Sequence, residues 1–101
     1  MIPPERFERD TGGTEREWLA SLPGACGPHR LNLMPDGRAT VQLHPEGAGS
    51  LHLHWTVLPP RRIALVSLPR LLVRYAFEGV DEPDRTAFMR YFDLWMQRGG
   101  G

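Results

Sequence analysis

The chain has 101 residues, of which 41% are hydrophobic and 24% are charged, and its 12 basic residues balance its 12 acidic ones. This length supports one domain with a modest core. No apolar run approaches the roughly 20 residues of a membrane-spanning helix, and the balanced charge gives no reason to expect a nucleic acid or a membrane as partner. All the basic residues are arginines, as is typical of proteins from GC-rich bacterial genomes. Because the first residues carry acids and no apolar signal core, we expect a cytoplasmic bacterial protein.

The first thirteen residues show no hydrophobic periodicity and contain paired prolines and paired glycines. Such a stretch predicts a loose N-terminal arm over residues 1–13. The rest of the chain predicts one domain over residues 14–98, followed by a disordered glycine tail over residues 99–101.

Thr14 begins the first predicted helix. With Glu17 it forms the Thr-x-x-Glu capping box, which satisfies two orphan backbone donors. Trp18 and Leu22 are four residues apart, so they share the helix face that would pack on a sheet. We expect this helix to end at Pro23-Gly24.

Alternating apolar and polar residues predict three strands in the middle of the chain. The first covers residues 29–34, and a strong Pro-Asp-Gly turn signal follows it. Two consecutive alternating runs, residues 38–44 and 51–57, come next. Their inward face consists of Ala39, Val41, Leu43, Leu51, Leu53, Trp55 and Val57.

The segment from Ile63 to Leu68 is apolar at nearly every position, which indicates a strand covered on both faces. We expect Pro59 and Pro60 to end the strand before it, because proline cannot donate to a sheet ladder. A last strand follows over residues 71–77. If the chain itself covers only one face of the apolar segment, another protein must cover the other face.

The last element is predicted as a helix. Either Asp81 or Asp84 can cap its start, and Pro83 suits its first turn. Side chains at helical spacing then form a wide aromatic face. They are Phe88, Tyr91, Phe92 and Trp95.

Together these elements predict a single α+β domain, an antiparallel β-meander of about five strands with an N-terminal and a C-terminal helix packed on one face. The edge strands of such a meander are open to strand addition by a partner. The expected core consists of Leu33, Val41, Leu43, Leu53, Trp55, Val57, Leu65, Tyr75, Phe77, Phe88, Phe92 and Trp95.

Three of the four histidines, His44, His52 and His54, fall on the outward face of the two alternating strands. A register that keeps both apolar sets inward can place His44 opposite His52 and Gln42 opposite His54. Directly paired residues have Cβ atoms about 4.5–5.5 Å apart, close enough for two imidazoles to share a metal ion. The pattern is compatible with a Zn²⁺ site, the one cofactor suggested by the sequence, or with a solvated, pH-sensitive histidine face.

The single cysteine lies in Cys26-Gly-Pro-His29, which resembles the thioredoxin tetrapeptide Cys-Gly-Pro-Cys except at its last position. In thioredoxins the first cysteine follows a strand and caps a helix, whereas here the tetrapeptide follows a helix. Two interpretations stay open, a Cys–His nucleophilic pair and a plain turn between helix and strand.

Four arginines in the second half of the chain, Arg61, Arg62, Arg70 and Arg74, could bind an anion or a partner, because guanidinium groups pair well with phosphate and carboxylate. The alternative is a solvated, ion-paired edge. Its counter-charges would come from Glu78, Asp81, Glu82 and Asp84.

No paired carboxylates, phosphate-binding glycine loop, serine elbow or zinc-ribbon spacing occurs in the sequence. We therefore predict a small interaction or regulatory module without catalytic activity. It would bind another protein, or a second copy of itself, through an edge strand or an apolar sheet face. The alternative prediction is a zinc-binding protein that uses the three outward histidines.

Overall fold

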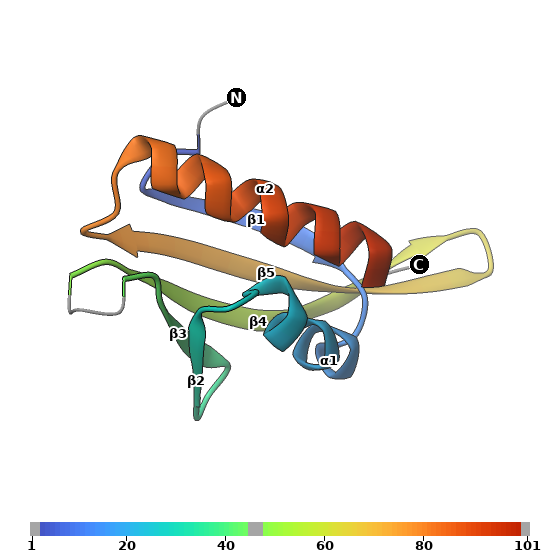
Figure 1. Cartoon of the computed structure of the whole chain (residues 1–101). Helices are drawn as coiled ribbons and strands as arrows, with labels where there is room; N and C mark the ends of the chain where they lie inside the picture. The colour runs from blue at the N-terminus through green and yellow to red at the C-terminus, as the bar shows by residue number, and fades with distance from the viewer. Residues whose placement is uncertain (1–2, 45–47, 100–101) are drawn as a thin grey trace.

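The computed structural model describes residues 3–44 and 48–99, in which two helices pack against one β-sheet (Figure 1). An antiparallel five-stranded sheet with the strand order β1-β5-β4-β3-β2 carries both helices, which confirms the predicted fold class. No helix within these ranges is long and apolar enough to cross a membrane. The elements are β1 (Arg6–Gly12), α1 (Glu15–Ala25), β2 (Arg30–Met34), β3 (Arg38–Gln42), β4 (Ser50–Ile63), β5 (Val66–Glu78) and α2 (Glu82–Gly99).

Strand β1 corrects the prediction of a loose arm over residues 1–13. From Arg6 to Gly12 this segment is an edge strand paired with β5, so the meander runs only from β2 to β5. Its inward residue Arg9 forms a bidentate ion pair with Asp93 of α2 and lies over the ring of Phe7. At the other end, Gly99 belongs to α2, and the rest of the predicted glycine tail lies outside the described residues.

Both helices begin where their sequence signals place them. The hydroxyl of Thr14 accepts the N–H of Glu17 at 3.1 Å, which confirms the capping box. The Asp81 carboxylate accepts the N–H of Asp84 at 3.1 Å, so Asp81 rather than Asp84 caps α2. The end of α1 differs from the prediction, because the helix continues through Pro23 and ends at Ala25.

The core lies between the two helices and one face of the sheet. Eight of the predicted core residues are buried, among them Val41, Trp55, Tyr75 and Phe92, and Trp95 packs partly buried against them. Three predictions are wrong, since Leu33, Val57 and Leu65 are exposed. The fully buried side chains with the largest volumes are Phe92, Leu22, Leu51, Leu53, Leu71, Val41, Val73 and Cys26.

The register of β3 on β4 keeps the predicted apolar pairs inward, with Val41 opposite Leu51. The predicted pairing of His44 with His52 is wrong, however, because Thr40 lies opposite His52. The tight turn before β3 fixes this register. Gly37 has a φ of 71°, and its carbonyl accepts the N–H of Trp55 at 2.8 Å.

The hairpin of β4 and β5 runs past the rest of the sheet and projects from it (Figure 1). Strand β3 pairs with β4 only as far as His54, and β1 pairs with β5 only as far as Arg70. The predicted separate strand over residues 63–68 is instead the end of this hairpin, and Pro59-Pro60 produces a shift in register where we expected a strand end. We call residues 57–68 the hairpin end.

Candidate functional site

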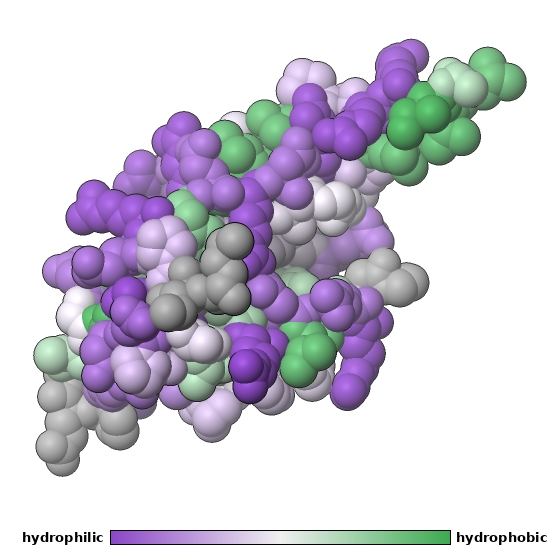
Figure 2. Space-filling view, turned by 90° about the horizontal axis from the view of Figure 1, so that it is seen from above, coloured by the Kyte–Doolittle hydropathy of each residue, from purple (hydrophilic) through white to green (hydrophobic). Residues whose placement is uncertain are grey.

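The hairpin end exposes large apolar side chains at the tip of the molecule, where Figure 2 shows them as a projecting green cluster. Leu65, next to the turn, is 103% exposed, and Val57 is 63% exposed. The other three members of the cluster are Ile63, Val66 and Leu68, each between 43% and 57% exposed. In a soluble monomer, an apolar cluster of this kind at one tip marks a contact site or an aggregation hazard.

The position of this cluster follows from the two-stranded geometry of the hairpin end. Beyond His54 and Arg70, β4 and β5 pair only with each other, and both helices pack farther back. The apolar segment was predicted to be covered on both faces, but the described residues leave it uncovered. A two-stranded ribbon without a third strand or a packed helix is marginally stable in water. Contact with a partner would therefore stabilise the ribbon as well as bury its side chains.

Three of the four predicted arginine contacts are ion-paired with β1. The Arg70 guanidinium lies 2.7 Å from the Asp10 carboxylate, and Arg61 lies 3.8 Å from the same group. Arg74 lies 3.1 Å from Glu8. Arg62 takes part in none of the ion pairs found within residues 3–44 and 48–99.

The counter-charges predicted for these arginines lie elsewhere. Glu78, Asp81, Glu82 and Asp84 lie at the far end of β5 and at the start of α2. Of the four arginines for which they were predicted as counter-charges, Arg61 and Arg62 lie at the opposite end of the β4–β5 hairpin. These acids are exposed, so they remain accessible to another molecule.

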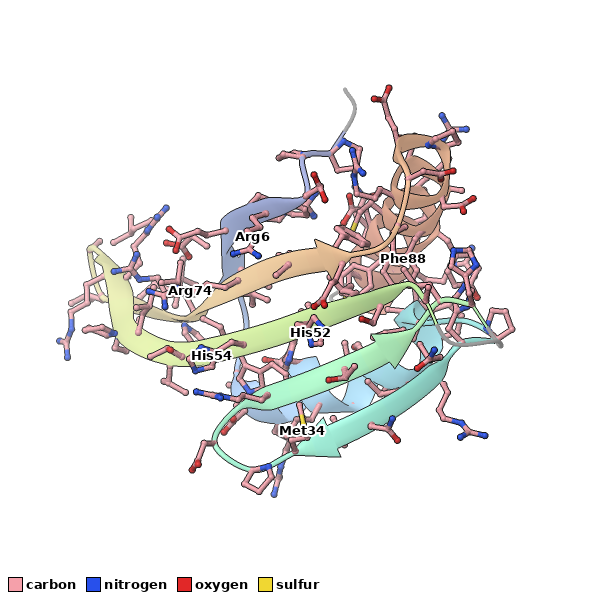
Figure 3. The ribbon with its side chains drawn as sticks, turned by 90° about the vertical axis from the view of Figure 1, so that its left-hand side faces the viewer. Arg6, Met34, His52, His54, Arg74 and Phe88 are labelled. Carbon is pink, nitrogen blue, oxygen red and sulfur yellow. The ribbon has the colours of Figure 1, made fainter. Side chains whose placement is uncertain are left out.

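The three outward histidines do not converge. His44 lies 3.5 Å from Asp84, and His52 lies 3.1 Å from Glu78. His54 lies between Arg38 and Arg74 in the sheet ladder, on the strand face away from the helix that carries Phe88 (Figure 3). Within the described part of the chain, no group of three or more His, Cys, Asp or Glu side chains could hold a metal ion. Zinc binding by these histidines stays a prediction without a ligand cluster to support it.

A second feature is an apolar cavity of ≈ 310 Å³ between the start of α2, the loop after α1 and the end of β3. We call it the end pocket. Its polar rim includes His29, His44 and Asp84. Its apolar lining consists of Cys26, Pro28, Leu43, Ala87, Phe88 and Tyr91.

The end pocket brings Cys26 and His29 to the same cavity, but the thiol is a poor nucleophile. Cys26 is buried, and this burial raises the pKa of its thiol to about 11. The ring of His29 lies 5.8 Å from that of Phe88, and no hydrogen bond joins the histidine to the thiol in the described structure. The Cys26 side chain is therefore a part of the pocket wall rather than a reactive group.

We expect iodoacetamide at pH 8 to alkylate native Cys26 at least about a hundredfold more slowly than the unfolded chain, because only the thiolate reacts. Quenched labelling followed by mass spectrometry measures both rates. The same chain in guanidinium chloride is the control. Equal rates would show that the thiol is accessible and ionised, and would reopen the nucleophile interpretation.

The hairpin end and the start of α2, which lines the end pocket, lie at opposite ends of the molecule (Figure 1). Strand β5 starts at the tip and ends at Glu78, just before the helix that lines the pocket. The longest dimension of the protein is 49 Å. A hairpin end therefore cannot reach the pocket of its own chain.

Only one of these two features has a local signal in the sequence. The apolar run from Ile63 to Leu68 was visible, although its place in the sheet was predicted wrongly. The end pocket has no local signal, because it is built from α1, β3 and α2, which are far apart in the chain. Comparisons with protein-family profiles, with curated proteins and with solved structures found no match to this chain.

Proposed function

We propose that the protein is a small cytoplasmic protein-interaction module, without catalytic activity, whose contact element is the hairpin end. The observation that supports this proposal is the projecting cluster of exposed apolar side chains, led by Leu65. Its members lie on one hairpin, between residues 57 and 68, and β4 and β5 anchor that hairpin in the core through Trp55 and Val73.

The physical argument is the free energy of burial. Fully burying one Val, Leu or Ile side chain contributes about 1.5–3 kcal/mol. The five side chains of the cluster are 43% to 103% exposed, so a partner that covers them would gain part of this free energy, from which the entropy cost of association is subtracted. Arg61 and Arg62 flank the cluster and would orient the partner, because charges at a rim act mainly on specificity and encounter rate.

The competing functions have less support. An enzyme would need a reactive nucleophile in the end pocket, and burial raises the pKa of the Cys26 thiol there to about 11, although His29, His44 and Asp84 lie at the rim. A zinc protein would need ligands that meet, and the described histidines each lie beside a different partner. Neither alternative accounts for the exposed tip.

Photo-crosslinking at position 65 tests the proposal. We expect a benzophenone side chain replacing Leu65 in the full chain to give protein adducts in cells, with the adducts identified by mass spectrometry. The same side chain at Leu94, an exposed apolar residue of α2 that is 59% exposed, is the matched control. No adducts at position 65, or the same adducts at both positions, would overturn the proposal.

A further inference from the structure

The structure points to a second copy of the chain as the partner of the hairpin end, and we infer that the Leu65 tip of one copy enters the end pocket of the other. This inference rests on the proposed function and names its partner. It uses two features of one molecule. One is an exposed apolar tip, and the other is a pocket lined mainly by apolar side chains.

The tip and the pocket agree in size and polarity. A volume of ≈ 310 Å³ lies at the lower limit of the ligand pockets found in proteins, about 300–1,000 Å³. Such a cavity suits one or two aliphatic side chains better than a large cofactor. Leu65 and Val66 are consecutive, lie at and after the turn, and project farthest from the core.

The charges around the two features are also complementary. Residues 57–70 contain three arginines and no acid. Residues 78–84, beside the pocket, contain four acids and no base. Arg62 is free of the ion pairs that occupy Arg61 and Arg70, so it can pair with Glu82 or Asp84 of another molecule. Opposite charges at a contact rim select the orientation of the partner.

The placement of the features at opposite ends of the molecule determines the symmetry. When two copies lie side by side and antiparallel, each tip comes beside the pocket of the other copy. The same contact then forms twice around a two-fold axis, which doubles the buried area and closes the assembly. The partner inferred here is therefore a homodimer in which each copy completes the pocket of the other.

Sedimentation velocity over a concentration series tests the inference. We expect the wild-type chain, 11.4 kDa, to sediment as a dimer at high concentration and to dissociate on dilution. Leu65→Glu should weaken the dimer at least about tenfold, and Ala87→Phe, which fills the pocket from an exposed helix position, should do the same. Leu94→Glu is the matched control and should leave the dissociation constant unchanged. All three substitutions are at exposed positions, and circular dichroism checks whether each variant folds.

Exchanging the charges of Arg62 and Glu82 tests whether these two residues contact each other across the dimer. Arg62→Glu and Glu82→Arg should each weaken the dimer, and the double variant should restore it, because the contact joins the two residues across the two copies. A strict monomer at all concentrations, or a dimer insensitive to Leu65→Glu, would overturn the inference. If position 65 then still gave adducts with a different protein, the proposed function would stand with another partner. If it gave none, both proposals would fail.

Discussion

Replacing Phe92 with alanine is expected to lower the free energy of unfolding by about 3–5 kcal/mol, the largest effect of any single substitution considered for this chain. Phe92 is 1% exposed and lies where both helices meet the sheet. Its ring packs edge-on against Trp18 of α1 at 6.0 Å and against Tyr75 of β5 at 5.9 Å. Alanine would leave a cavity shared by three elements, which cannot all move to fill it.

Urea unfolding followed by tryptophan fluorescence measures this loss. The matched control is Leu94→Ala, two residues farther along the same helix but 59% exposed, which should change stability by less than about 0.5 kcal/mol. Domains of this size have stabilities of roughly 5–15 kcal/mol, so the loss in the Phe92 variant is a large fraction of the total. Similar losses for the two variants would mean that α2 does not pack on the sheet as described.

The second large effect is expected at Gly37, where replacement by alanine should cost about 2–3 kcal/mol. Gly37 has a φ of 71°, and a Cβ atom built on it would lie 2.5 Å from the carbonyl oxygen of Trp55. A non-glycine residue in the left-handed region costs about 1–2 kcal/mol by itself. Relief of the clash would also disturb the bond from the Trp55 N–H, which holds β3 in register on β4.

Thermal and urea unfolding of Gly37→Ala test this expectation, with Gly12→Ala as the matched control. Gly12 lies in β1, has no atom within 4 Å of a built Cβ, and lies outside the positive-φ region. Its replacement should therefore be neutral or slightly stabilising. If both alanines were tolerated equally, the turn would not be what fixes the register.

Sequence periodicity was sufficient to predict the fold where the burial of a residue depends only on which face of its strand or helix it occupies. The alternation through Val41, Leu53 and Trp55 predicted the inward face correctly, and the capping pattern at Thr14 placed the start of α1. Strand β1 was not predicted because only one of its inward residues, Phe7, is apolar. The other two are Arg9 and Thr11. An arginine whose charge is balanced by Asp93 breaks an apolar pattern without breaking the strand.

The site was less predictable, for two physical reasons. Alternation constrains the parity of strand pairing, but the register itself depends on where the turn brings the strands together. That is why the three histidines could not be placed from sequence. The apolar run at Ile63 was noticed, but its exposure depends on how far α1 and α2 extend over the sheet, which no local pattern encodes.

The shift in register between Leu58 and Arg61 divides the β4–β5 pair into a part that belongs to the core and a part that projects from it. Before it, inward side chains such as Trp55 and Val73 hold the domain together. Beyond it, the apolar side chains are exposed, so their replacement is expected to change the stability of the folded state little. Substitutions among the exposed apolar residues of 61–68 therefore act mainly on what the hairpin end contacts, while the stability of the domain is preserved. A new specificity could arise through single substitutions, each on a chain that still folds.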